Sequence, residues 1–191
     1  MNKELCLRTL ENLRRRGFEA DFVETSADAL RLVLQEAESA QTVGWGGSET
    51  LRQIGARDEL TARGKVCANT AASADLFLLS ANALLTDGRI VNIDGTCNRI
   101  SASLFGPKRV VYVIGENKIV DGSLDDAIAR IHREACPPNA RRLGRQTPCG
   151  LTGTCTNCDA PDRMCRVIAI LERKPARQSA RVLLVGEKLG F

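Results

Sequence analysis

The segment SANALLTDGRIVNIDGTCNRISASLFGPKRVVYVIGENKIV (residues 80–120) carries most of the information about the fold. Its apolar, often β-branched runs at 83–87, 89–94 and 109–115 are short and end at turn residues, as strands do. A helical stretch at 98–105 lies between the last two runs. Alternation of strands with helices is typical of α/β layer folds.

The same alternation continues on both sides of this segment. Helices are expected at 2–17, 26–38, from 48 onward and at 123–135, with Ser26 and Ser123 as caps. Further strands are expected at 18–24, 41–45, 65–69, 75–81, 167–174 and 180–191. The sequence therefore predicts one α/β domain over residues 1–191, built on a mostly parallel sheet flanked by helices.

Composition limits the partners and the compartment. The chain has 191 residues, 43% of them hydrophobic, with a net charge of +4 and 4% aromatic residues. No apolar run reaches the roughly 20 residues of a membrane span, and the charged segment at 1–17 lacks the apolar core of a signal peptide. Scarce aromatics argue against a nucleic-acid partner. We expect a cytoplasmic protein, with the single histidine, His132, on a solvated helix face.

Four cysteines crowd one stretch, TPCGLTGTCTNCDAPDRMC (147–165), with the spacing C-x5-C-x2-C-x6-C. In a reducing compartment, clustered cysteines are typical of a metal or cluster site. The segment 136–166 is therefore expected to be a cysteine-rich loop inserted in the domain. Its ligands would be Cys149, Cys155, Cys158 and Cys165.

The spacing leaves the identity of the metal open. Zinc usually takes two short C-x-x-C knuckles and only Cys155/Cys158 forms one, which favours a [4Fe–4S] cluster slightly. Neighbouring arginines would stabilise thiolates of either site. Redox-switch or incidental thiols are the remaining alternative.

A glycine-rich loop, VGWGGSET (43–50), follows an expected strand and opens an expected helix. Such loops let a ligand approach the backbone, and helix-terminal amides favour anions. A tight turn with Ser48 as a plain helix cap explains the pattern equally well.

Polar side chains gather at the later strand ends. Asn82, Asp94, Asn98 and Arg99 lie where α/β sheets collect ligands, and Lys118 follows the next strand. Turn chemistry or solvation could explain several of them. Arg99 is expected to face the cleft of the glycine loop, or to brace Asp94 through a bidentate pair. A surface arginine is the alternative.

GWGGSETL (44–51), the 80–120 segment and the helix after it resemble the LUD-domain, or lactate-utilisation, proteins over most of residues 1–135. The cysteine-rich stretch resembles an extension found in a subset of that family, often in anaerobic bacteria. The resemblance implies a fold like that of the NagB/RpiA/CoA-transferase superfamily. It also implies a bacterial cytoplasmic protein linked to oxidation of L-lactate to pyruvate, with iron–sulfur partner subunits.

Carried onto this chain, the resemblance marks a pocket for an anionic small molecule and assigns no mechanism. Its positions are Gly46, Gly47, Ser48, Thr50, Asn82, Asp94, Asn98, Arg99 and Lys118.

Three functions fit the sequence. The first is an accessory or subunit of a 2-hydroxy-acid oxidation system with an iron–sulfur or zinc site. The second is an enzyme for a phosphorylated or CoA-linked metabolite, with a structural zinc site and with Glu49, Asp94 or Arg99 as catalytic candidates. The third is a metal or redox sensor without turnover.

Overall fold

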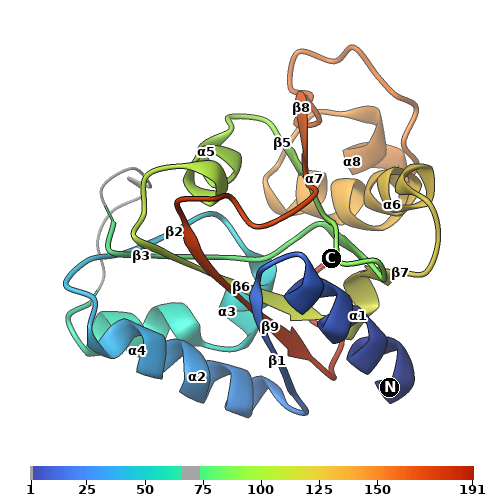
Figure 1. Cartoon of the computed structure of the whole chain (residues 1–191). Helices are drawn as coiled ribbons and strands as arrows, with labels where there is room; N and C mark the ends of the chain where they lie inside the picture. The colour runs from blue at the N-terminus through green and yellow to red at the C-terminus, as the bar shows by residue number, and fades with distance from the viewer. Residues whose placement is uncertain (1, 66–73) are drawn as a thin grey trace.

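A five-stranded parallel sheet forms the centre of the molecule, as Figure 1 shows. The computed structural model describes residues 2–65 and 74–191, so most of the strand expected at 65–69 lies outside the described part. The strands lie in the order β1 (Glu19–Val23), β9 (Ser179–Val185), β6 (Arg109–Gly115), β3 (Leu76–Leu79) and β2 (Val43–Trp45). Each neighbouring pair is parallel, which confirms the expected sheet.

A second, four-stranded sheet was not foreseen. It contains β7 (Ile119–Val120), β4 (Ala83–Leu85), β5 (Ile90–Asp94) and β8 (Val167–Leu171), in that order. The pairs β4–β5 and β5–β8 are antiparallel. The turn between β4 and β5, which contains Gly88 with φ +89°, is too short for the crossover that a parallel pair needs.

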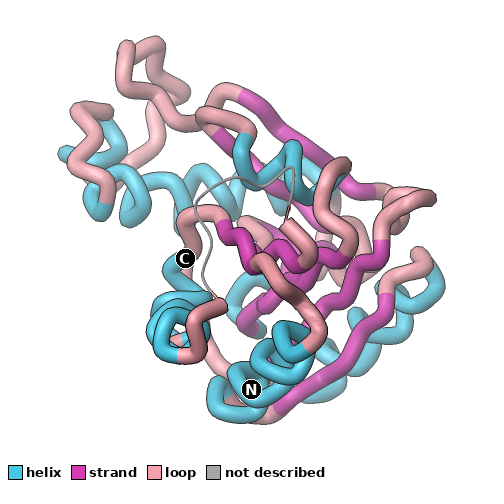
Figure 2. Tube along the Cα trace, turned by 90° about the vertical axis from the view of Figure 1, so that its left-hand side faces the viewer, coloured by secondary structure: helices cyan, strands magenta, loops and turns pink. Residues whose placement is uncertain are grey.

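Alternate side chains of the central strands build two cores. In β6, Val110, Tyr112 and Ile114 face α1 and the inner face of the small sheet, where Leu84 and Ile90 pack. Val111 and Val113 face the opposite core, to which α2, α3 and α4 contribute. Figure 2 shows helices on both sides of the strands.

The helices of the first half lie close to their expected places. They are α1 (Lys3–Arg15), α2 (Ser26–Glu38), α3 (Glu49–Gln53), α4 (Ala56–Ala62) and α5 (Asn98–Leu104). Ser48 caps α3 as expected. The cap of α2 is Thr25 and not Ser26, because the Thr25 hydroxyl accepts the amide of Asp28 at 3.1 Å.

The outer face of the small sheet is covered by α6 (Leu124–Arg130), whose cap Ser123 forms the expected capping arrangement with Asp126. This helix does not stop at residue 135. A π-helical turn (Ile131–Ala135) leads directly into α7 (Cys136–Arg142), and α8 (Pro148–Thr152) follows. Pro137 and Pro138 lie in the first turn of α7, where missing amide donors cost little.

The segment expected to be a loop at 136–166 thus contains two short helices, α7 and α8, and is irregular between them and after α8. Figure 1 shows it on the side of the small sheet away from α2 and α4. Within the described part of the chain, no helix is long and apolar enough to cross a bilayer.

Candidate functional site

A cavity of about 240 Å³ opens where three adjacent parallel strands end. Gly47 and Ser48 follow β2, Ser80 and Asn82 follow β3, and Lys118 follows β6, and all of them line the cavity. The carboxyl ends of parallel strands meet at one edge of a sheet, where loops without ladder partners can bind a ligand. The wall opposite comes from α7 and the residues just before β8.

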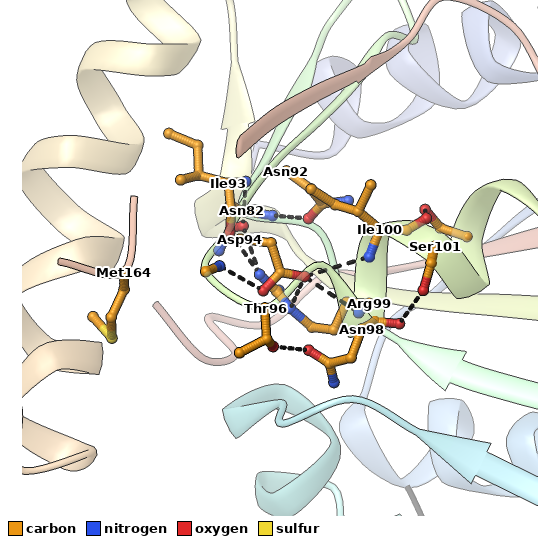
Figure 3. A network of polar contacts seen from close by, with 12 residues as sticks. Asn82, Asn92, Ile93, Asp94, Thr96, Asn98, Arg99, Ile100, Ser101 and Met164 are labelled. Atoms are coloured by element: carbon orange, nitrogen blue, oxygen red, sulfur yellow. Dashed lines mark hydrogen bonds and ion pairs between the residues drawn. The ribbon is translucent and has the colours of Figure 1, made fainter. Parts of the chain in front are cut away.

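The loop after β5 supplies a polar network at one side of the cavity, drawn in Figure 3. Arg99 Nη2 donates to the carbonyl of Ile93 at 2.7 Å and to Asn82 Oδ1 at 3.3 Å. Asn82 Oδ1 also accepts the amide of Ile93 at 3.0 Å, so it has two donors within the protein. Because the oxygen is occupied, the amide nitrogen of Asn82 is the group left for a ligand.

Asp94 holds the backbone at the start of α5, where Arg99 lies. Its carboxylate accepts the amides of Gly95 and Arg99 at 2.9 and 3.2 Å. The nearest contact between the two side chains joins Arg99 Nε and Asp94 Oδ2 at 3.6 Å. The expected bidentate pair is therefore wrong, because the Arg99 Nη2 group is turned toward Ile93. The alternative of a surface arginine also fails, since only 15% of the Arg99 side chain is exposed.

Gly46 and Gly95 allow neighbouring segments to pack closely at the edge of the cavity. A Cβ at Gly46 would overlap Cγ of Arg99, so only glycine lets the arginine side chain lie across the loop. A Cβ at Gly95 would lie 3.1 Å from the carbonyl oxygen of Met164, where the cysteine-bearing segment contacts the cavity wall.

Most of the residues marked by the sequence share this one cavity. Gly46 and Thr50 lie behind its wall, whereas the others line it: Gly47, Ser48, Asn82, Asp94, Asn98, Arg99 and Lys118. Glu49 also lines it, but its carboxylate is bound by Arg52, which lowers the Glu49 pKa. Ionised Glu49 cannot serve as a general acid at neutral pH.

Lys118 is buried at the floor of the cavity, with 4% of the residue exposed. Its Nζ lies 2.9 Å from both Thr50 Oγ1 and Ser80 Oγ. Burial, together with the nearby cations Arg130 and Arg99, lowers the Lys118 pKa to about 7. Thr50 and Ser80 were not foreseen as partners of Lys118, because α3 and the end of β3 meet only in the folded chain.

Positive charge exceeds negative charge around the cavity. Arg142 and Arg145 add to Arg99 and Lys118 in its lining, and Arg145 pairs with Asp162 at 3.4 Å. Arg142 instead donates to the amide oxygen of Asn139 at 2.6 Å. Within the described residues no ion pair joins Arg142 or Lys118 to a carboxylate. The surplus favours an anionic ligand.

A second, smaller cavity of about 20 Å³ lies beside the first. The expected quartet lines it: Cys149, Cys155, Cys158 and Cys165. Cys149 comes from α8, whereas the other three come from the irregular chain between α8 and β8. The sulfur of Cys149 is 3.4 Å from Thr147 Oγ1.

Two further donors at this cavity were missed. Cys136 Sγ lies 3.2 Å from Cys165 Sγ, and His132 Nδ1 lies 3.4 Å from Cys155 Sγ. The expectation of a solvated His132 is wrong, because the continuous helix turns it toward the cysteines. The four-residue spacing of His132 and Cys136 along that helix was the available signal. Donor atoms of His132, Cys136 and Cys165 lie within 4.8 Å of one another, so this group could hold a metal ion.

Electrostatics at the cysteines favour ligation. The contact between Cys136 and Cys165 lowers the pKa of one thiol, that of Cys165, and raises the pKa of Cys136. Burial lowers the pKa of His132, with a further contribution from Arg163. A thiolate and a neutral imidazole are the forms that bind metals.

The two cavities have a common wall. Met164 and Cys165 line both of them, and Cys136 lines the larger one while contacting Cys165. A ligand in the larger cavity would therefore lie next to whatever the cysteines hold.

Comparisons with known proteins agree with this architecture. The model of the LUD domain matches residues 6–185. A solved structure of a DUF162 family protein from Deinococcus radiodurans superposes with a TM-score of 0.59 at 16% identity, covering 97% of this chain and 99% of that one. That likeness shows the fold alone. A comparison with curated proteins gave no significant match. The chain belongs to the LUD domain family, which relates it to lactate utilisation at the level of the family.

Proposed function

We propose that this protein is a component of a system that oxidises L-lactate or a related 2-hydroxy acid, and that it binds a small carboxylate beside a cysteine-held iron–sulfur centre. The observation that carries the proposal is the wall of Met164 and Cys165 common to both cavities. Family membership supports the link to lactate.

The larger cavity suits a small anionic acid. Its volume of about 240 Å³ lies below the usual 300–1,000 Å³ of pockets for larger ligands, so an acid of a few carbons fits better than CoA. Arg99 and Arg142 can bind the carboxylate, because guanidinium groups match its two oxygens. The Asn82 amide can donate to the neighbouring hydroxyl or carbonyl oxygen.

The four thiols of the expected quartet line the smaller cavity, but among the described residues they do not form a group that converges on one ion. Ligands of a single zinc lie about 2.3 Å from it and must converge on one point. Among the described residues, His132, Cys136 and Cys165 are the group that converges within 4.8 Å. Cys149, Cys155 and Cys158 stand around the cavity with Cys165, as the four thiolates of a [4Fe–4S] cluster would.

Such a cluster would supply a one-electron acceptor next to the bound acid. The protein itself orients the acid through Arg99 and Asn82. Its neighbouring arginines, Arg163 and Arg166, donate to the backbone of the cysteine segment and offset negative charge on the thiolates. Iron–sulfur partner subunits would receive the electrons.

The test combines two measurements on anaerobically purified protein. Metal and sulfide analysis should give about four iron and four sulfide per chain, with a brown colour. Calorimetry should show that pyruvate and L-lactate bind. Colourless protein that binds neither acid would contradict the proposal.

A second candidate has one specific observation in its favour. The group His132, Cys136 and Cys165 is compact enough for a single zinc, which would clip α7 to the strand β8. The protein would then be an enzyme for a phosphorylated metabolite, bound by the same cations. One zinc per chain, together with binding of inorganic phosphate in preference to pyruvate, would favour it.

A further inference from the structure

We propose that Lys118 is a nucleophile that captures a 2-oxo acid as a covalent imine at the floor of the larger cavity. This inference rests on the proposed function, in which a small 2-hydroxy or 2-oxo acid occupies that cavity. It adds a covalent step that acid binding does not require.

The surroundings of Lys118 are unusual for a lysine that serves only as a charge. The residue is 4% exposed, and its Nζ contacts the hydroxyls of Thr50 and Ser80 at 2.9 Å. Within the described part of the chain no carboxylate pairs with it, and a solitary buried ammonium is costly. Hydroxyls can donate to a neutral amine as well as accept from an ammonium, so both contacts suit the uncharged form.

Nearby cations also favour the uncharged amine. Arg130, on α6, donates to the carbonyls of Asn82 and Asn117 at 2.7 and 2.9 Å, which fixes its guanidinium close by. Arg99, on α5, lines the same cavity. Burial and these two charges lower the Lys118 pKa to about 7. A lysine desolvated beside other cations is a recognised arrangement for imine formation with carbonyl substrates.

The backbone at Gly190 covers one side of the Lys118 amine. A Cβ at this position would lie 3.1 Å from Lys118 Nζ, so the backbone passes close over the amine on that side. The cavity is the other side, because Lys118, Ser80 and Asn82 all line it. A 2-oxo acid whose carboxylate is bound by Arg99 would place its carbonyl carbon toward this floor.

The step balances without an oxidant. Neutral Nζ forms a bond to the carbonyl carbon, and the carbonyl oxygen takes a proton to give a carbinolamine. The carbon–oxygen bond then breaks, and the oxygen leaves as water with a proton from the nitrogen, which gives the imine. Thr50 and Ser80, both within hydrogen-bond distance of Nζ, can relay these protons.

The test is reductive trapping in the full chain. Anaerobically purified protein is incubated with pyruvate and sodium cyanoborohydride, and the adduct is located by intact mass and peptide mapping. We expect a single adduct on Lys118, absent from Lys118→Arg and retained in Lys108→Arg, whose lysine is exposed. Its rate of formation should rise with pH to half its maximum near pH 7.

The outcomes separate this inference from the proposed function. Adducts spread over exposed lysines, unchanged by Lys118→Arg or Lys118→Met, would overturn the inference. Pyruvate binding in calorimetry without an adduct on Lys118 would also overturn it, and would leave the proposed function in place. If calorimetry shows no pyruvate binding and mapping shows no adduct on Lys118, the result contradicts both the inference and the proposed function. Peptide mapping of the unaltered protein shows whether Lys118 carries the adduct, even if a Lys118 variant folds poorly.

Discussion

Replacing Cys165 with serine is expected to lower the metal content by at least about tenfold, since even partners outside the ligand shell change metal affinity roughly 10–100-fold. Cys165 lines the cysteine cavity and contacts Cys136 at 3.2 Å. It belongs both to the quartet and to the group with His132, so either proposed centre would lose one ligand. A hydroxyl is a poor substitute for a thiolate toward iron or zinc. The measurement is metal analysis of anaerobically purified protein.

Cys97→Ser is the matched control. It removes one thiol from a partly buried cysteine that lies outside the cysteine cavity, at the start of α5. Its metal content should equal that of the unaltered protein. Equal metal content in Cys165→Ser and Cys97→Ser would show that Cys165 is not a ligand.

Arg99→Lys is expected to weaken pyruvate binding about 10–100-fold, the loss of one or two charge-assisted hydrogen bonds. Arg99 holds Ile93 and Asn82 through Nη2, and its Nε lies 3.6 Å from Asp94, which leaves Nη1 for a ligand. The ammonium of lysine is a point charge without the planar fork, so it cannot contact Ile93 and Asn82 and also bind the carboxylate of the ligand. Calorimetry with pyruvate measures the change.

Arg31→Lys serves as the control for this substitution. Arg31 lies on α2 with 60% of its side chain exposed, and it pairs only loosely with Asp28 at 3.7 Å. Its replacement should change neither the binding of pyruvate nor the unfolding temperature. A folded Arg99→Lys variant with unaltered affinity would remove Arg99 from the ligand site.

The inner strands of the central sheet, β3, β6 and β9, could be predicted because most of their side chains are buried on both faces. Runs such as RVVYVIG stay apolar throughout and end at turn residues, so sequence alone marks them. The small sheet could not be separated from the large one. Its pairing of β5 with β8 joins Asp94 to Val167, far apart in the chain, and local pattern holds no information on such contacts.

The site residues also divide into those that the sequence alone could mark and those that only the fold brings together. Loop residues such as Ser48 and Asn82 could be identified as candidate site residues because polar residues are uncommon beside apolar strands. Cys136 was missed because it precedes two prolines that suggested a loop, whereas α7 begins at Cys136 and holds both prolines in its first turn. The burial of Lys118 against Thr50 and Ser80 depends on how three strand ends meet, which only the folded chain specifies.

The central claim is that the acid site and the cysteine centre are neighbours across Met164 and Cys165. The most direct test is to titrate the anaerobically purified protein with pyruvate while recording its visible absorption spectrum, with cobalt in place of zinc where zinc is found. Binding next to the centre should perturb the thiolate–metal bands in a saturable way, with the same dissociation constant as calorimetry gives. Pyruvate binding that saturates in calorimetry while the spectrum stays unchanged would contradict the account.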